Sequence, residues 1–246
     1  MSLTIRTSLN TNLPAITLNR NLEDMYHALE RLSSGRRINR ASDGPADLVI
    51  SMQLQSRIAS LGREIDGLSV NIRKYETVSA SVLEMRDSLV ELRSLAIGAA
   101  NSSFNDETTR RAYAAEAELI VEGYNRSIRN TYYNGKAMLD GSEGSLADIS
   151  ELADLDFSTP EAAIASLEKI DAATAQLDSV VVDLGATQKN ELESRRQSLE
   201  VTRANLTAAE STLMDTDYAL EYSNLVAGMI RAQAATAMLG HGLLQN

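Results

Sequence analysis

A seven-residue repeat of apolar side chains most restricts what this sequence can fold into. Leucine takes the repeated position at Leu192, Leu199, Leu206, Leu213 and Leu220. An apolar side chain takes it again at Leu61, Leu68, Tyr75, Val82 and Leu89. A seam that repeats every ~3.5 residues keeps facing a partner only when helices wrap around each other. We therefore expect two long helices that pack as coiled coils, and a structural role rather than a catalytic one.

The composition favours helices over short strands. The 246 residues are 43% hydrophobic and 4% aromatic, and 3 prolines and 13 glycines interrupt the pattern. A sandwich or barrel would need many more turn residues and β-branched or aromatic runs. We predict a mostly α protein: an elongated antiparallel helical rod with coiled-coil N- and C-terminal helices and little or no β structure.

Helical spacing of apolar residues predicts a first helix over 9–32, which Gly35 ends as a C-terminal cap. A second helix is predicted from Pro45 towards Ala100, and an N-terminal proline suits its first turn because no N–H is lost there. A helix of this length is longer than a compact domain of this size needs. These helices therefore indicate a rod.

Capping residues and glycines refine the long second helix. Ser42 or Asp43 is the expected N-terminal cap. We expect a break or bend near Gly62 or Gly67, because glycine weakens a helix interior.

The remaining chain reads as a return helix, a connection and two further helices. Residues 110–129 carry helical apolar spacing after a cap at Asn105 or Asp106, and Asn134-Gly135 predicts a tight turn. Residues 140–159 are rich in glycine, serine and acids, and we expect a surface connection at the tip of the rod.

A further helix is predicted to begin with Thr159 as cap and Pro160 in its first turn. Its seam slips by one residue between Leu184 and Leu192, so we expect local unwinding near Gly185. The last helix is predicted over 225–244.

The charge distribution and the lack of cysteine exclude several functional classes. The net charge is −11, and residues 141–193 hold 2 basic and 12 acidic side chains. Nucleic-acid binding rests mainly on clustered Lys and Arg, so we expect no nucleic-acid partner. Disulfide and thiolate chemistry need cysteine, of which there is none.

The sequence also shows no pattern typical of a targeting segment, a catalytic motif or a metal site. The first 25 residues lack the apolar core of a secretory signal, and no stretch approaches the ~20 apolar residues of a membrane span. His27 and His241 have no metal-ligand spacing, and no nucleophile elbow or phosphate loop occurs. We expect no enzyme activity, no catalytic or metal site, no cofactor and no membrane insertion.

The two ends of the chain are too apolar to lie in water alone. Burial must come from pairing with each other and with other subunits, which predicts polymerisation surfaces. The predicted subunit-interface residues are Leu9, Leu13, Ile16, Leu22, Met25, Leu29, Arg31, Leu32, Arg36, Arg37, Leu220, Leu225, Met229, Ile230, Ala234 and Met238. For any one seam, a monomeric helical bundle is the plainer alternative.

The basic turn after the first helix has two readings. Arg36, Arg37 and Arg40 can pair across subunits with a neighbour's acidic face, such as Glu191 and Glu193 or Asp215 and Asp217. Alternatively these arginines form a solvated turn, because single surface ion pairs are seldom decisive.

Residues 29–43 (LERLSSGRRINRASD) closely resemble the signature of bacterial flagellins. Four further stretches resemble flagellin in the same order: 92–101, 133–141, 205–211 and 215–219. The likeness covers nearly all of the chain outside 142–160, where the variable outer domains of longer flagellins are missing. The sequence is thus similar to a short-form flagellin.

The resemblance implies a structural subunit that self-assembles into the bacterial flagellar filament for swimming motility. Residues 1–44 and 210–246 would form the coiled-coil core of the filament, and 45–209 the outer-tube rod with a short surface tip at about 141–159. It also implies export through the flagellar type III apparatus, an extracellular filament or alternatively a periplasmic one, and three partners: an export chaperone, the filament cap and the hook-junction proteins.

One implied surface departs from the family pattern. The region that a Toll-like innate receptor reads in some flagellins maps onto Glu91, Arg93, Leu95 and Glu116, and Glu91 stands in place of an arginine. Because a reversed charge weakens a desolvated contact, we expect weak or no receptor activation.

Two other functions remain open on the sequence. A hook-filament junction protein resembles flagellin at both termini, although the stretches at 92–101 and 133–141 resemble flagellin itself. A non-polymerising helical binding or adaptor module is the alternative from a different class.

Overall fold

The computed structural model describes the backbone of residues 3–101 and 106–244 and the side chains of 15–101 and 106–240. It is mostly helical, with a two-stranded hairpin as its one sheet in these ranges, as the composition predicts. The chain divides into two compact units, residues 1–62 with 201–246 and residues 63–200. Each unit is described by itself.

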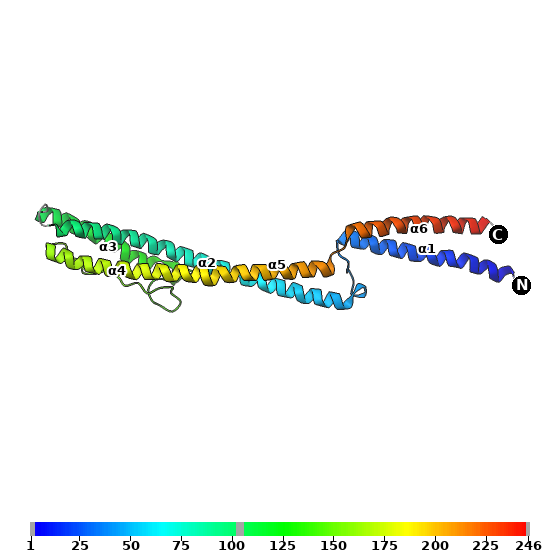
Figure 1. Ribbon diagram of the computed structural model, residues 1–246, viewed down its shortest axis with the longest axis horizontal. Coiled ribbons are helices and arrows are strands. Elements are labelled where there is room, and N and C mark those ends of the chain that lie inside the picture. The colour runs from blue at the N-terminus through cyan, green and yellow to red at the C-terminus, as the bar shows by residue number, and fades with distance from the viewer. Residues whose placement is uncertain (1–2, 102–105, 245–246) are drawn as a thin grey trace. The chain divides into compact units, whose positions relative to one another are not determined.

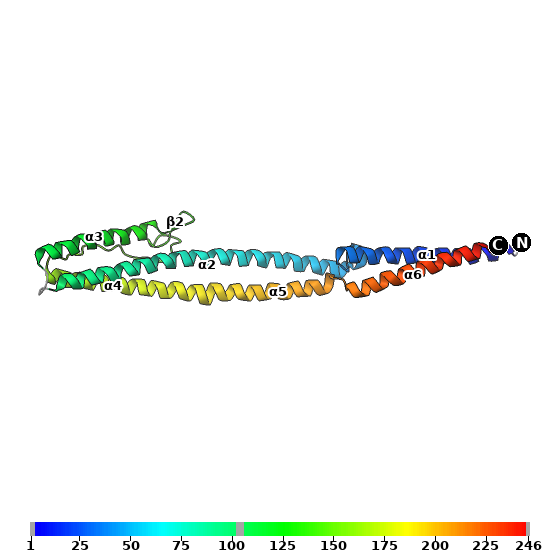
Figure 2. The ribbon, with the colours of Figure 1, turned by 90° about the horizontal axis from the view of Figure 1, so that it is seen from above.

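The first unit is built on the two ends of the chain. Helix α1 (Leu3–Ser34) and helix α6 (Tyr218–Leu244) lie side by side in both ribbon views (Figures 1 and 2). Gly35 ends α1 at φ +71°, a backbone conformation that favours glycine, so its predicted role as a C-terminal cap is confirmed. The short 3₁₀ helix η1 (Ala41–Asp43) follows.

Helix α2 (Pro45–Ala100) starts at the predicted proline but runs without interruption. The expected break near Gly62 or Gly67 was therefore wrong, and a bend there stays a prediction. Each glycine costs about 1 kcal/mol in a helix interior. Burial of the neighbouring Leu61, Ile65 and Leu68 offsets that cost.

The second unit is built mainly from α2 after residue 62, α3 (Glu107–Asn130) and α4 (Pro160–Ala186). Helix α4 continues through the π-helix η2 (Thr187–Glu193) into α5 (Ser194–Met214), which belongs to this unit up to residue 200. Figure 2 shows α3 along one side of α2 and α4 along another. The largest fully buried side chains include Met85, Leu89, Leu92, Tyr124, Phe157, Ile170 and Leu177. One hydrophobic core thus joins α2, α3 and α4.

The predicted N-terminal caps of α3 and α4 are confirmed. Asp106 accepts a hydrogen bond from the backbone N–H of Thr109 at 2.8 Å, and Thr159 accepts one from Ala162 at 3.1 Å. Asn134 and Gly135 both have positive φ, and they join strands β1 (Tyr132–Tyr133) and β2 (Lys136–Ala137) in the predicted tight turn. Asn105 lies outside the described residues.

The connection from 140 to 159 is more than a surface loop. Ile149, Leu152 and Phe157 are buried in the core, which corrects the sequence prediction. Asn125 fixes the segment to α3, because its side-chain amide both donates to the carbonyl of Leu152 and accepts from its N–H, each at 2.8 Å. Three isolated apolar residues in an acidic segment have no period, so the pattern could not reveal their burial.

The leucine repeat from Leu192 to Leu220 does not lie on one helix. Helix α5 ends at Met214 and α6 begins at Tyr218. Asp217 caps the new helix by accepting hydrogen bonds from the N–H groups of Ala219 at 2.9 Å and Leu220 at 3.1 Å. Leu213 and Leu220 are therefore seven residues apart in the sequence but lie on different helices.

Candidate assembly surfaces

The inner face of the α1/α6 pair is lined by small and apolar residues. Ala28 on α1 and Leu225 and Ala235 on α6 are buried, each less than 10% exposed. Gly228 is also buried, and a Cβ added there would lie 3.6 Å from that of Met25. Small side chains let the two backbones approach closely and keep the pair in register.

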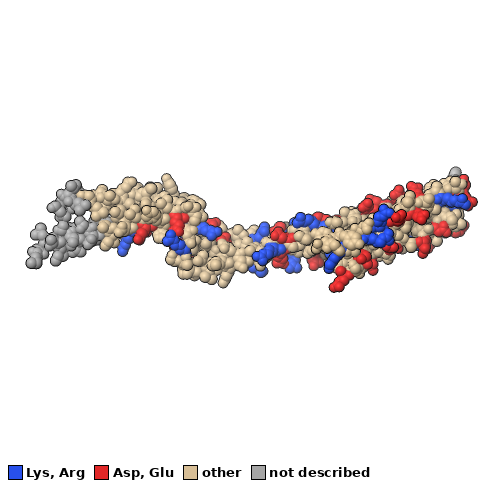
Figure 3. Space-filling view, turned by 180° about the vertical axis from the view of Figure 1, so that it is seen from behind, with Lys and Arg blue, Asp and Glu red and all other residues tan. Residues whose placement is uncertain are grey.

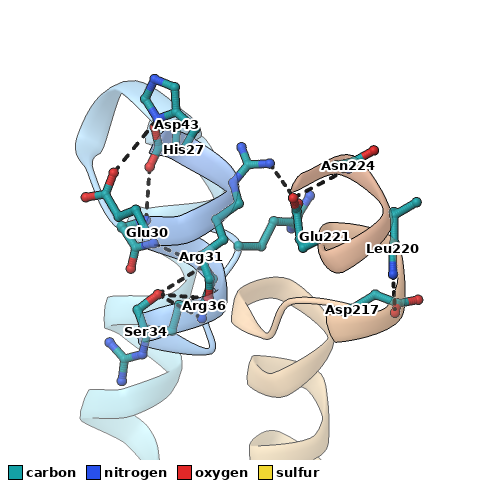
Figure 4. A network of polar contacts seen from close by, with 12 residues as sticks. His27, Glu30, Arg31, Ser34, Arg36, Asp43, Asp217, Leu220, Glu221 and Asn224 are labelled. Carbon is teal, nitrogen blue, oxygen red and sulfur yellow. Dashed lines mark hydrogen bonds and ion pairs between the residues drawn. The ribbon is translucent and has the colours of Figure 1, made fainter. Parts of the chain in front are cut away.

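One buried ion pair crosses this inner face. The Arg31 guanidinium donates from Nη1 to Oε1 of Glu221 at 3.0 Å, and Asn224 donates to the other carboxylate oxygen at 3.4 Å (Figure 4). The Glu221 side chain is 8% exposed and that of Arg31 is 34% exposed. The carboxylate therefore depends on Arg31 and Asn224 for the hydrogen bonds that water would otherwise supply.

Two grooves flank the α1/α6 pair and differ in character. A polar groove of about 310 Å³ is lined by Asp24, His27, Arg31, Asp43, Glu221, Asn224 and Arg231, among others. An apolar groove of about 580 Å³ is lined by Leu18, Leu22, Ala232, Gln233, Thr236 and Ala237. No charged side chain lines the second groove, so a neighbouring apolar helix can bind there.

The segment after α1 clasps the break between α5 and α6. Arg37 donates its backbone N–H to the carbonyl of Met214 at 2.7 Å, and Thr216 donates to the carbonyl of Gly35 at 3.0 Å. The Arg37 guanidinium also donates to the carbonyl of Leu213 at 2.8 Å and to the Asp47 carboxylate at 3.1 Å. We name this arrangement of residues 35–37 with residues 213–216 the junction clasp.

Asp43 closes the turn that leads out of the clasp. Its carboxylate accepts the backbone N–H groups of Asn39 at 3.0 Å and Arg40 at 2.9 Å. The hydrogen bond from Arg40, followed by that from Asn39, lowers the pKa of Asp43 below its ordinary value. Asp43 was predicted as a possible cap of α2, but it instead holds the preceding turn.

The outer face of α6, opposite α1, is apolar and exposed. Val226, Ile230 and Ala234 follow one another at four-residue spacing on this face. Ile230 is 61% exposed. In the part of α6 whose side chains are described, Glu221 and Arg231 are the charged residues, and both line the polar groove. Figure 3 accordingly shows few charged side chains on the visible surface of the terminal helices.

Two sequence comparisons decide the family. Residues 5–144 match the bacterial flagellin N-terminal helical region, and residues 167–241 match the bacterial flagellin C-terminal helical region. The chain belongs to the flagellin family. This membership agrees with the signature at residues 29–43, which forms the end of α1, the junction clasp and η1.

Related flagellins match along almost the whole chain. Flagellin of Halalkalibacterium halodurans is 31% identical over 94% of each chain. Flagellin of Bacillus subtilis is 28% identical over 94% of each chain, and a flagellar filament core protein of Treponema maltophilum is 26% identical over 96% of each. Among solved structures, Bacillus cereus flagellin superposes with a TM-score of 0.46 and 17% identity, covering 59% of this chain and 94% of that one.

The structure sorts the predicted interface residues of this flagellin into three groups. The inner group, at least half-buried between α1 and α6, comprises Leu22, Met25, Arg31, Leu32 and Leu225. The outward group, exposed on the same helices, comprises Ile16, Leu29, Leu220, Met229, Ile230, Ala234 and Met238. Leu9 and Leu13 fall within α1, but their side chains lie outside the described residues.

The third group consists of the arginines of the basic turn. Arg37 pairs with Asp47 at 3.1 Å and Arg40 pairs with Glu30 at 3.1 Å, so both have partners within the chain. Arg36 forms a backbone bridge with Asp215, while its side chain is exposed. Pairing of these arginines across subunits stays a prediction.

The receptor-like surface of the flagellin lies on the second unit. Arg93 donates to the Asp171 carboxylate on α4 at 2.8 Å, while Glu91 and Glu116 are exposed and Leu95 is half-buried. Arg93 is thus held by its own chain. Whether a receptor recognises this surface stays a prediction.

Sequence reasoning missed two groups in the first unit. Glu221 is an isolated acid in an apolar helix, and that isolation was the one available signal for a buried ion pair. The carbonyls of Leu213 and Met214 in the junction clasp are backbone acceptors, which no side-chain pattern reveals. Within the described ranges, no helix is apolar over a length sufficient to cross a membrane.

Proposed function

We propose that this chain is the structural subunit of a bacterial flagellar filament for swimming motility and that it polymerises through its terminal helices. Residues 1–44 and 210–246 form the filament core in this proposal, and 45–209 form the outer tube. Membership of the flagellin family supports it. The family is structural and non-enzymatic, so the work of the chain is mechanical.

The uncharged outer face of α6 carries the proposal. A helix that is apolar on all sides is normally buried. Helix α1 covers one side of α6, yet Val226, Ile230 and Ala234 remain on the opposite side. Burying apolar surface yields about 25 cal/mol per Å². A neighbouring subunit that covers this face therefore stabilises both the helix and the filament.

The apolar groove supplies a second, different surface for such a contact. An interface between two different patches of one molecule generates a ring or an open helical polymer. The groove at Leu18, Leu22 and Ala232 can receive an outer face such as that around Ile230. Arg36, whose side chain is exposed beside the clasp, is our candidate for an ion pair with an acidic neighbour.

The finer partners follow from the family. We propose that an export chaperone holds the apolar C-terminal helix before assembly, that the type III apparatus exports the chain, and that the cap and hook-junction proteins contact the ends of the filament. An extracellular filament is the location we propose. Labelling intact motile cells with a membrane-impermeant amine reagent tests it, because a periplasmic filament would stay unlabelled until the outer membrane is opened.

Ile230→Asp tests the proposal against a matched Ile230→Leu control. The purified full chain is seeded with sheared filaments, pelleted and examined by electron microscopy. We expect long uniform filaments from the wild type and Ile230→Leu, and none from Ile230→Asp. Circular dichroism checks that all three fold alike. Normal filaments from Ile230→Asp would refute a role for this face.

Truncations separate filament formation from the two other functions. Chains that lack residues 1–32 or 225–246 should stay soluble, because each lacks one of the paired terminal helices. If the full chain itself forms only short or soluble species with seeds present, the hook-junction or adaptor function takes the place of the filament subunit.

A further inference from the structure

The helix formed by α4, η2 and α5 contains one residue too many for its seam. Leu177 and Leu184 are seven residues apart, as are Leu192 and Leu199, but eight residues separate Leu184 from Leu192. Seven residues of an α-helix fall ~20° short of two turns, whereas eight overshoot by ~80°. A straight α-helix would therefore turn Leu192 away from the face that Leu184 occupies.

The π-helix η2 lies within this eight-residue interval. It spans Thr187–Glu193. A π-turn closes each hydrogen bond over one residue more than an α-turn, so it takes up a residue without the matching rotation. The Gln188 side chain reaches Glu193, five residues on, at 3.2 Å.

Both leucines consequently face α2. Leu184 is buried in the large core with Val78 and Val82 of α2, and Leu192 is buried with Leu68 and Ile72. Arg195, beyond η2, still reaches Glu64 of α2 at 2.6 Å. The apolar seam of α4 and α5 therefore stays on α2, although its leucines are seven residues apart on either side of η2 and eight apart across it.

One of the two buried rows of α2 changes its spacing at the same level, while Leu68, Tyr75 and Val82 keep seven-residue spacing. Its buried residues Ile65 and Ile72 are seven apart, as are Val78 and Met85, but Ile72 and Val78 are six apart. Tyr75 fills this position and packs against both the Leu184 core and the Leu192 cluster. In this one row, a six-residue interval on α2 thus lies opposite the eight-residue interval on its partner.

We infer that η2 is a register joint, a π-turn that absorbs one inserted residue so that α4 and α5 share a continuous seam on α2, and that it is the point where this helix yields first. π-Turns are rare and occur mostly as single turns inside α-helices, and helices kink where they occur. At the entrance to η2, the N–H of Thr187 is shared between the carbonyls of Asp183 and Leu184.

Two single-residue deletions test the register joint. Ala186 and Ala172 are both exposed alanines on the same helix. Deleting Ala186 restores seven-residue spacing from Leu184 onward and turns the π-turn into α-helix. Deleting Ala172 leaves the helix one residue out of register in either case. If the π-turn is retained, all seam residues before Ala172 turn away from α2. If the π-turn is lost, Leu177 and Leu184 turn away instead.

Thermal unfolding and hydrogen exchange of the full-length monomer provide the readouts. We expect deletion of Ala186 to leave Tm unchanged or raised, and deletion of Ala172 to lower it by about 5 °C or more. In the wild type, amides of 187–193 should exchange at least about tenfold faster than those of 196–202, and deletion of Ala186 should remove the difference. Equal losses of Tm for the two deletions, failure of the Ala186 deletion to fold, or uniform exchange in the wild type would each overturn the inference.

Discussion

Arg31 donates to Glu221 across 3.0 Å and neutralises a carboxylate that the α1/α6 pairing has removed from water. The two residues are 190 positions apart in sequence. This contact therefore joins the two terminal helices directly, and it combines charge with burial on a surface that is lined mostly by small and apolar residues.

Arg31→Ala should lower the free energy of unfolding of the first unit by about 2 kcal/mol. Removing one partner of a buried pair costs about 3–5 kcal/mol, and the partial exposure of Arg31 reduces this. Arg40→Ala is the control, since its pair with Glu30 is more exposed and should cost under about 1 kcal/mol. Urea titrations of the full chain measure both, and equal costs would contradict the special status of Glu221.

Arg37→Ala should loosen the junction clasp. The variant loses hydrogen bonds to the carbonyl of Leu213 and to Asp47, which together contribute about 1–2 kcal/mol at this half-exposed position. Amide exchange of 213–217 should become faster. Arg36→Ala, which removes an exposed neighbouring guanidinium, should leave exchange there nearly unchanged, and a reversed order would argue against the clasp.

Tyr124→Phe should stabilise the second unit by about 1 kcal/mol. The Tyr124 hydroxyl is buried without a hydrogen-bond partner among the described residues. Removing an unsatisfied buried hydroxyl relieves its desolvation cost. Tyr132→Phe, at an exposed tyrosine, serves as the control and should leave Tm unchanged.

The buried Tyr124 should also make the free energy of unfolding depend on pH in the alkaline range. Burial raises its pKa from 10.0 to about 12. Between these values the unfolded chain releases the phenolic proton while the folded chain retains it, so stability falls as pH rises from 10 through 12. Unfolding midpoints across this range should fall less steeply in Tyr124→Phe than in the wild type. Identical slopes would show that the phenol is not protected in the folded state.

The Asp43 carboxylate should make stability fall as the pH is lowered, the opposite of the effect of Tyr124. Backbone hydrogen bonds from Arg40 and Asn39 lower its pKa below 3.8, so its contribution is present above that value and is lost as pH falls through the lowered one. Asp43→Asn should weaken the turn at neutral pH and lessen this acid loss. Amide exchange of residues 39–43 at several pH values gives the comparison, and an unchanged pH profile would count against the cap.

Because Glu91 stands in place of an arginine, we expect this chain to activate a Toll-like receptor weakly or not at all. A reversed charge at a desolvated contact opposes binding. The exposed carboxylate of Glu91 is the departure from the family pattern, and Glu91→Arg should raise activation in a cell reporter assay. Strong activation by the wild-type monomer would contradict the prediction.

Local signals in the sequence determined most elements of this protein. Pro45 and Pro160, the caps Thr159 and Asp106, and the Asn134-Gly135 turn each act through the backbone of neighbouring residues, and the heptad leucines mark the long helices by their spacing. Such effects are readable because they depend on spacing alone. The extra residue between Leu184 and Leu192 likewise predicted local unwinding near Gly185, and the π-helix η2 begins two residues later at Thr187.

Tertiary structure decided what depends on partners distant in the sequence. It kept α2 continuous through Gly62 and Gly67, buried Ile149, Leu152 and Phe157 from a polar loop, and ended α5 at the clasp. It also divided the apolar residues of the terminal helices between an inner face and an outer one. Each outcome rests on burial and on backbone carbonyls that only the folded chain brings together, so spacing along the sequence could not supply it.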